Sequence, residues 1–347
     1  MKVALILPAN KWFCPYVNTY TNIFDKENIA YDVIFWNRDQ TEPSINSYSS
    51  KSRNKILSYI GYLRFIKSKL KKNRYDRIVV FSSQLAILLF FSLIRLKGKY
   101  ILDFRDLSIE QKPILYSLYK ILLSHSLLNV LSSPGFKSYL PKKNSYVVVH
   151  NLDMNAVTNI GNKEDVGKKN EKNEISILTI GSIRDYDSNI AVVNALRNQE
   201  KFRVSFVGKG IASQRIAEYV KSNNIRNVDF KGFYKKKDEG NIIMQYDFLN
   251  VFYPNIKSHS SALSNRFYNA LIYKKPLLVT SNSIQGDFVE KYNLGLSVST
   301  CDNLASLLLE FYENFNRETF ENNCNFLLQK FVQENSMFEK LLIKHLQ

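Results

Sequence analysis

The sequence predicts an α/β protein made of two doubly wound halves, each with its own parallel sheet. Short apolar runs alternate with segments of helical periodicity along most of the 347 residues. Runs such as 2–8 (KVALILP) are continuously apolar, as strands of parallel sheets are when both of their faces are covered. The alternation stops in the polar stretch 159–174 and restarts at residue 175. A chain of this length has room for two domains of ordinary size.

The first half is expected to begin with strand 2–8 and to continue in strand–helix alternation. Apolar residues at helical spacing predict a long helix over 51–72, namely Ile56, Ile60, Leu63, Ile66 and Leu70. The run 84–96 predicts a buried helix, because it is shorter than the roughly twenty residues that span a bilayer. The other expected strands are 31–38, 76–83, 99–106, 129–133 and 145–151, and the other helices are 16–26, 113–129 and 134–140.

The second half shows the same alternation. Strands are expected at 175–183, 202–210, 228–233, 247–254 and 294–299, with helices at 190–196, 213–223 and 242–246. The stretch 260–280 (SSALSNRFYNALIYKKPLLVT) predicts a polar loop, a short helix, a basic turn and a buried strand. Phe267, Ala270 and Leu271 give the helical spacing, and Pro276 ends the helix.

Composition and short motifs narrow the classes of function. The formal net charge of +17 favours polyanions, anionic membrane surfaces or phosphorylated substrates. The cysteines are far apart and form no CxxC pair, which argues against zinc and a disulfide framework and fits a reducing compartment. Neither GxGxxG nor GxxxxGK(S/T) occurs, which disfavours a dinucleotide enzyme and a P-loop ATPase.

Residues that follow strands are the candidates for ligand binding, because open α/β sheets bind ligands at the carboxyl ends of their strands. Arg266 lies at the start of the helix in 260–280, where free backbone N–H groups and a positive charge favour an anion. An ordinary capped helix is the alternative. Gly181 and Gly208 follow strands, and a residue without Cβ lets the backbone approach a phosphate. Plain turn glycines are the alternative there.

Five segments of the second half stand in a characteristic order, namely ILTIGSI, FRVSFVGKG, NVDFKGF, DFLNVFYP and LSNRFYNALIYKKPLLVT. In this order and at this spacing they resemble the nucleotide-sugar domain of GT-B glycosyltransferases, most closely family 4 enzymes of bacterial capsule and O-antigen (surface polysaccharide) biosynthesis. The last segment is close to the family's signature of proline-asparagine-lysine, glutamate-aromatic and glycine-lysine-proline. In the first half, the resemblance rests on KVALILP, YILDFRDL, SSPGFKSYL and VVVHNLD.

The resemblance implies two Rossmann-like domains that face a cleft. Residues 1–155 would form the acceptor-binding domain and residues 175–333 the nucleotide-sugar domain, with a linker at 156–174. A C-terminal helix within 334–347 would cross back to the first domain. The implied activity is transfer of a hexosyl or N-acetylhexosaminyl group from a nucleotide-diphosphate sugar, such as a UDP-sugar, to a glycan or polyprenyl-linked acceptor.

The resemblance also implies roles for single residues of the donor site. Arg266 stands where the family has a lysine or arginine on the diphosphate, and arginine suits a bidentate phosphate contact. Asn269 stands at the glutamate that usually holds the ribose hydroxyls, and Ser261 at the glutamate near the donor sugar. The family's pair of glutamates is therefore absent.

Other donor-site positions come from the loops after the strands. Near Gly181 the family usually has an arginine at the position of Ser182, and Arg184 is the substitute from the same loop. The backbone of Phe233 and Tyr234 stands where the family pairs with the base. Lys209 is expected to approach the phosphates.

Two acids of the first half are the candidates for catalysis. Asp103 and Asp106 lie at the charged end of the strand expected at 99–106, and either carboxylate is a candidate general base for an inverting transfer. The alternative is an Asp–Arg ion pair with Arg105 that fixes the loop. No metal or other cofactor is expected, because Asp185 and Asp187 form the sequence DYD in a loop where this fold uses no metal clamp.

The basic helix 51–72 predicts a membrane surface as partner. An apolar stripe flanked by lysine and arginine is expected to lie on an anionic leaflet, and a solvated helix is the alternative. The protein would then be cytoplasmic and peripheral at the inner face of the plasma membrane, where polyprenyl-diphosphate-linked acceptors lie. Nucleic acid is not expected as a partner, because no RNA-module signature is present.

Two other functions remain open at this point. A nucleotide-sugar epimerase has the same fold but needs carboxylates from both halves and no glycan acceptor. A non-catalytic GT-B scaffold in a membrane polysaccharide complex is compatible with the missing glutamates.

Overall fold

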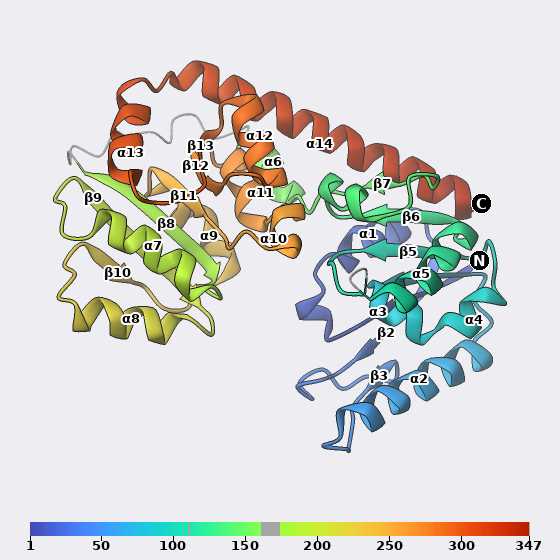
Figure 1. The fold of residues 1–347 in the computed structure, drawn as a ribbon. Helices are drawn as coiled ribbons and strands as arrows, with labels where there is room; N and C mark the ends of the chain where they lie inside the picture. The colour runs from blue at the N-terminus through green and yellow to red at the C-terminus, as the bar shows by residue number, and fades with distance from the viewer. Residues whose placement is uncertain (110–111, 161–173, 347) are drawn as a thin grey trace. The chain divides into compact units, whose positions relative to one another are not determined.

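The computed structural model describes residues 1–109, 112–160 and 174–346, and it divides the chain into two units (Figure 1). Unit 1 is Met1–His150 with Gln333–Gln347, and unit 2 is Asn151–Val332. Helix α6 (Met154–Ile160) overlaps the start of the linker expected at 156–174, and residues 161–173 of that linker lie outside the described residues. The C-terminal helix α14 (Arg317–Leu346) is much longer than the expected helix in 334–347 and belongs to both units.

Unit 1 is built on a parallel sheet of seven strands in the order β3-β2-β1-β4-β5-β6-β7. The continuously apolar runs form its centre, where β1 pairs with β2 on one side and β4 on the other. Short β3 at the edge was not expected from the sequence. The strands are β1 (Lys2–Leu7), β2 (Ala30–Trp36), β3 (Ser47–Tyr48), β4 (Arg77–Phe81), β5 (Tyr100–Phe104), β6 (Leu128–Leu131) and β7 (Val147–Val148).

The helices of unit 1 follow the expected alternation with one break. The apolar run 84–96 forms two short helices instead of one, since Leu89 leaves the helical backbone conformation between them. The helices are α1 (Val17–Lys26), α2 (Lys55–Lys72), α3 (Ser83–Leu88), α4 (Phe90–Ile94), α5 (Pro113–His125) and the end of α14, with short 3-10 turns at Lys11–Phe13 and Pro134–Tyr139.

Helix α2 buries a different face from the one expected. Its buried residues are Ser58, Tyr62 and Ile66, whereas Ile56 is 70% exposed and Ile60 is 40% exposed. The side chain of Tyr62 sets this rotation, because its ring packs against Trp36 and its hydroxyl donates to the carbonyl of Leu7 at 2.6 Å. The apolar residues on the first turns of α2 are therefore left at the surface.

Unit 2 contains a parallel sheet of six strands in the order β10-β9-β8-β11-β12-β13. The strands are β8 (Ile175–Ser182), β9 (Phe202–Lys209), β10 (Val228–Phe230), β11 (Phe248–Val251), β12 (Leu277–Thr280) and β13 (Gly295–Val298). The helices are α6, α7 (Tyr186–Leu196), α8 (Ser213–Ser222), α9 (Glu239–Met244), α10 (Lys257–Ser261), α11 (Asn265–Ile272), α12 (Ile284–Tyr292), α13 (Leu304–Glu313) and the start of α14. Short α10 lies where the sequence predicts the start of a polar loop.

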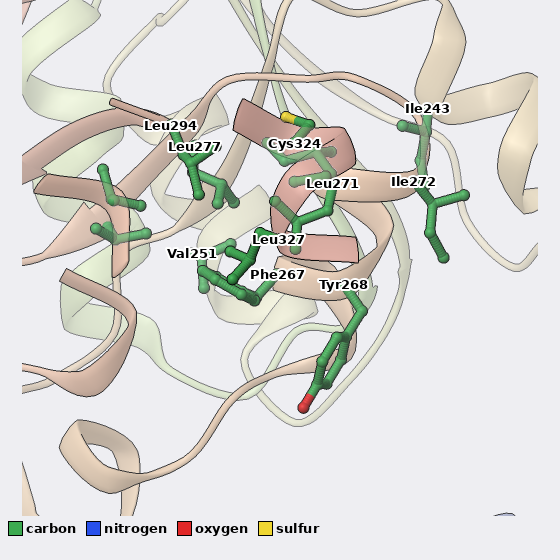
Figure 2. Close-up of a cluster of buried hydrophobic side chains, with 14 of the residues drawn as sticks. Ile243, Val251, Phe267, Tyr268, Leu271, Ile272, Leu277, Leu294, Cys324 and Leu327 are labelled. Carbon is green, nitrogen blue, oxygen red and sulfur yellow. The ribbon is translucent and has the colours of Figure 1, made fainter. Parts of the chain in front are cut away.

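Helix α11 is enclosed in the core of unit 2. Figure 2 shows Phe267, Tyr268 and Leu271 of this helix with side chains from β12, from the residue just before β13 and from α14. Every residue of α11 after Asn265 is buried, including the polar Arg266 and Asn269. Packing on all sides fixes this helix, so its polar side chains are held in defined positions.

Candidate functional site

The carboxyl ends of β8 and β11 form the switch point of the unit 2 sheet. From β8 the chain moves outward to β9 and β10, and it then returns to place β11 on the other side of β8. In open α/β sheets, ligands bind outside the strand ends at such a point. Arg266 reaches this place from α11.

The guanidinium of Arg266 binds the ends of both switch-point strands. Its Nε donates to the carbonyl of Ile180 at 2.5 Å, and Nη2 donates to the carbonyl of Ser182 at 2.9 Å. Nη1 donates to the carbonyl of Asn250 in β11 at 3.2 Å. Arginine has five N–H donors, so within the described part of the chain two remain for a ligand.

The charge of Arg266 is buried without a counter-ion among the described residues. The residue is 7% exposed, and none of the described residues forms an ion pair with it. The ring of Tyr253 lies 5.6 Å from the guanidinium and contributes only a cation–π contact. A buried cation that is neutralised by carbonyl dipoles alone favours the approach of an anion.

The N-terminus of α11 is capped and cross-linked to α12. Ser264 Oγ accepts from the N–H of Phe267 and donates to Gln285 Oε1 at 2.8 Å. Gln285 Oε1 also accepts from the N–H of Ser264 at 3.0 Å. The cap satisfies one N–H of the first turn, and the positive end of the helix dipole lies at the turn that carries Arg266.

One turn after Arg266, Asn269 contacts a buried acid that the sequence reading missed. Asn269 Nδ2 donates to Glu239 Oε2 at 3.1 Å, and Glu239 is 8% exposed at the start of α9. The hydroxyl of Tyr234 donates to Glu239 Oε1 at 2.5 Å, and Lys236 pairs with the same carboxylate. In the sequence, Glu239 belongs to the run KKKDEG, which reads as a solvated charged turn.

The two predicted site glycines lie side by side at the ends of β8 and β9. A Cβ on Gly208 would lie 2.1 Å from the carbonyl oxygen of Gly181, so Gly208 permits the close approach of the strands. Gly181 has φ of +92°, and a Cβ there would be 3.7 Å from the hydroxyl of Tyr234. Gly181 is thus a neighbour of the Tyr234–Glu239 pair.

The structure brings Gly181, Tyr234, Arg266 and Asn269 together, and it places the other predicted residues around or away from them. Arg184 is exposed, and its Nε donates to Ser182 Oγ at 2.9 Å. Exposed Lys209 lies opposite Ser182 in the sheet register. Phe233 is 75% exposed, and buried Ser261 donates its hydroxyl to the carbonyl of Lys257 within α10.

The predicted acids of unit 1 differ sharply in their surroundings. Asp103 is 1% exposed and binds Arg105 through both oxygens, at 2.5 Å and 2.7 Å. The hydroxyl of Tyr20 also donates to Asp103, at 2.7 Å. The ion pair given above as the alternative for this loop is therefore present. Asp106 is exposed just beyond the end of β5.

Metal-binding side chains do not gather in the described parts of the chain. Within residues 1–109, 112–160 and 174–346 there is no group of three or more His, Cys, Asp or Glu that could hold a metal ion. The cysteines Cys14, Cys301 and Cys324 are free and buried. Burial raises the pKa of the Cys301 and Cys324 thiols to about 12, so both stay protonated at neutral pH.

Comparison with solved structures shows the same two-domain fold in other proteins. The lipopolysaccharide outer core galactosyltransferase WaaB matches with a TM-score of 0.69 and 14% identity, covering 99% of each chain. Alr3699/HepE of Anabaena, solved in complex with UDP and glucose, matches with a TM-score of 0.65 and 12% identity over 99% of each chain. UDP-N-acetylglucosamine 2-epimerase from Rickettsia bellii matches with a TM-score of 0.64 and 11% identity, covering 99% of this chain and 96% of the epimerase.

These likenesses establish the fold class predicted from the sequence, which is α/β with two Rossmann-like domains of the GT-B type. No protein-family model matches the chain, and no curated protein matches it in sequence.

Proposed function

We propose that the protein is a glycosyltransferase that moves a sugar from a nucleotide-diphosphate sugar to a glycan or polyprenyl-linked acceptor in bacterial surface polysaccharide synthesis. The observation that carries the proposal is the buried Arg266 at the switch point of a GT-B sheet, which has no counter-ion in the described part of the chain. A structural neighbour with this fold holds UDP and glucose, and another is a galactosyltransferase. A UDP-hexose or UDP-N-acetylhexosamine is the corresponding donor.

The donor site is proposed from unit 2 residues. Arg266 and the N-terminus of α11 face the diphosphate, and exposed Lys209 and Arg184 add positive charge at the end of the sheet. A departing nucleoside diphosphate gains negative charge, which these groups stabilise most in the transition state. The backbone at Phe233–Tyr234 takes the base, and Ser261 lies near the donor sugar.

The residues that act on the acceptor are proposed to lie in unit 1. Of the two candidates for the general base we favour Asp106, because its side chain is exposed whereas Asp103 is buried in an ion pair with Arg105. Asp103 then acts as a positioning residue that holds the loop after β5.

Peripheral attachment to the inner face of the plasma membrane is proposed through α2. Ile56 and Leu57 are 70% and 56% exposed on its first turn, beside exposed Lys51, Arg53 and Lys55. Exposed apolar side chains beside cations are the composition that binds anionic leaflets. No helix in the described parts of the chain is long and apolar enough to cross a membrane. Attachment of this kind would bring the enzyme to a polyprenyl-diphosphate-linked acceptor.

A nucleotide-binding screen tests the proposed function. Thermal unfolding is measured with UDP, GDP and CMP and then with their sugars, and a ligand at 100 times its Kd stabilises by about 2.7 kcal/mol. We expect UDP and a UDP-sugar to raise the Tm, and we expect turnover to require an added acceptor. A shift with none of these compounds favours a scaffold. Conversion of UDP-N-acetylglucosamine without acceptor favours an epimerase, which is the function of one structural neighbour.

A further inference from the structure

The carboxylate of Glu239 is buried, which is unusual for an acid among the described residues of this chain. Among the described residues, only Asp103 and Glu239 are buried acids. Asp103 has a buried bidentate partner, Arg105, whereas the cationic partner of Glu239 is Lys236, whose side chain is 67% exposed. Burying a carboxylate costs several kcal/mol unless its charge is matched or used.

The donors that face Glu239 come from two elements of the proposed nucleotide site. Tyr234 precedes α9 in the loop after β10, and Asn269 lies on α11, one turn from Arg266. Burial, reinforced by the hydrogen bond to Glu239, raises the pKa of Tyr234 far above its ordinary value. The phenol therefore stays protonated and donates at neutral pH, so both neutral partners fix the orientation of the carboxylate.

Lys236 is the partner that a ligand can replace. Its side chain lies mostly in solvent, and an exposed ion pair contributes little to stability. When its ammonium moves into water, Glu239 Oε2 keeps its bond from Asn269 and regains acceptor capacity. The amide of Asn269 is uncharged, so it cannot replace the glutamate that the family has at this position. Its Nδ2 instead donates to the carboxylate of Glu239.

We propose that Glu239 accepts hydrogen bonds from the ribose hydroxyls of the bound nucleotide, with Asn269 and Tyr234 as its positioning residues. A carboxylate with two oxygens suits a pair of neighbouring hydroxyls. The carboxylate absent from position 269 on α11 is thus supplied from α9. This inference rests on the proposed function, because it takes the nucleotide site of unit 2 as given.

The test compares UDP with 2′,3′-dideoxy-UDP by isothermal titration calorimetry. A hydrogen bond to a charged group is strong, so the wild-type protein is expected to bind the dideoxy compound about 10- to 100-fold more weakly. Glu239→Gln keeps the shape but loses the charge, and it is expected to bind both compounds with nearly equal affinity. Glu218→Gln on the exposed face of α8 is the matched control and should discriminate as the wild type does.

The outcomes separate this inference from the function on which it rests. If the wild-type protein binds UDP but does not distinguish it from the dideoxy compound, Glu239 has no ribose role although the nucleotide site stands. The same conclusion follows if Glu239→Gln, folded by circular dichroism, still discriminates as strongly as the wild type. If the wild-type protein binds neither UDP nor GDP, the nucleotide site and the ribose role are both refuted.

Discussion

At the scale of single residues, the partners of a buried charge decide whether its role is structural or whether it can attract a ligand. Asp103 and Arg266 are both buried and both were predicted for the site, but Asp103 is paired with the cation Arg105 and also accepts from the hydroxyl of Tyr20. Among the described residues, the hydrogen-bond partners of Arg266 are carbonyl oxygens and no acid pairs with it. The charge of Asp103 is balanced in its ion pair with Arg105. The charge of Arg266 leaves a positive potential at the ends of β8 and β11.

Replacing Arg266 tests this difference. Arg266→Lys keeps the charge but loses the planar fork, so we expect UDP affinity to fall at least 10-fold, which corresponds to about 1.4 kcal/mol. Arg226→Lys at an exposed position is the matched control and should bind UDP normally. Calorimetric titration measures both. Unchanged affinity in a folded Arg266→Lys protein would refute the diphosphate assignment.

Asp103 in β5 and Asp106 just after it are expected to differ in their effects on stability. Asp103→Asn leaves the Arg105 guanidinium buried without its partner, so the free energy of unfolding should fall by about 3–5 kcal/mol. Asp106→Asn, at an exposed position, should change stability by no more than about 0.5 kcal/mol while abolishing most turnover. Urea unfolding and transfer assays measure these effects. An Asp106→Asn enzyme with full turnover would show that Asp106 is not the base.

At the scale of elements, periodicity predicted where helices and strands lie, but not always which way they face. The pattern in 51–72 correctly indicated a helix, yet Ile66 is the one residue of the predicted stripe that is buried in α2. Tyr62 and Ser58 are buried instead, because the ring of Tyr62 packs against the rings of Trp36 and Tyr48. Likewise, Gly181, Arg266 and Asn269 could be predicted from strand ends and from the family resemblance. Glu239 could not, because its burial arises from contacts with the distant α11.

The rotation of α2 makes a prediction about membranes. Ile56→Ser with Leu57→Ser should reduce co-sedimentation with vesicles rich in phosphatidylglycerol, because each exposed apolar side chain contributes about 1.5–3 kcal/mol when buried in lipid. Ile114→Ser, also highly exposed but on α5, is the control. Binding should weaken with salt. If the double variant sediments like the wild type, α2 is not the attachment site.

At the scale of the whole molecule, buried phenols limit stability at alkaline pH. Tyr20 and Tyr62 are fully buried, and desolvation raises the pKa of each well above its ordinary value of 10.0. The unfolded chain loses these protons near pH 10 while the folded chain keeps them. The two phenols therefore contribute fully to the free energy of unfolding below pH 10, and this contribution is lost progressively as the pH rises toward their folded-state pKa values.

We therefore expect the urea midpoint to fall steeply above pH 10, with tyrosine ionisation in the ultraviolet coinciding with unfolding. Tyr62→Phe should make this fall shallower, although it loses the hydrogen bond to Leu7 and is less stable at pH 8. Phenol ionisation well before unfolding would contradict the assigned burial.

Helix α14 has a consequence for how the protein is made. Phe338, Leu342 and Leu346 near its end are buried in the same core cluster as Val3 and Leu5 of β1. His150, where the chain leaves unit 1, is bound to Glu334 and Asn335 of that helix. On the ribosome, the first 150 residues of unit 1 therefore emerge before unit 2 but lack part of their interior until residues 338–346 have been added. The order of synthesis and the order of completed folding are reversed, so unit 1 is the part of the nascent chain most dependent on protection while translation proceeds.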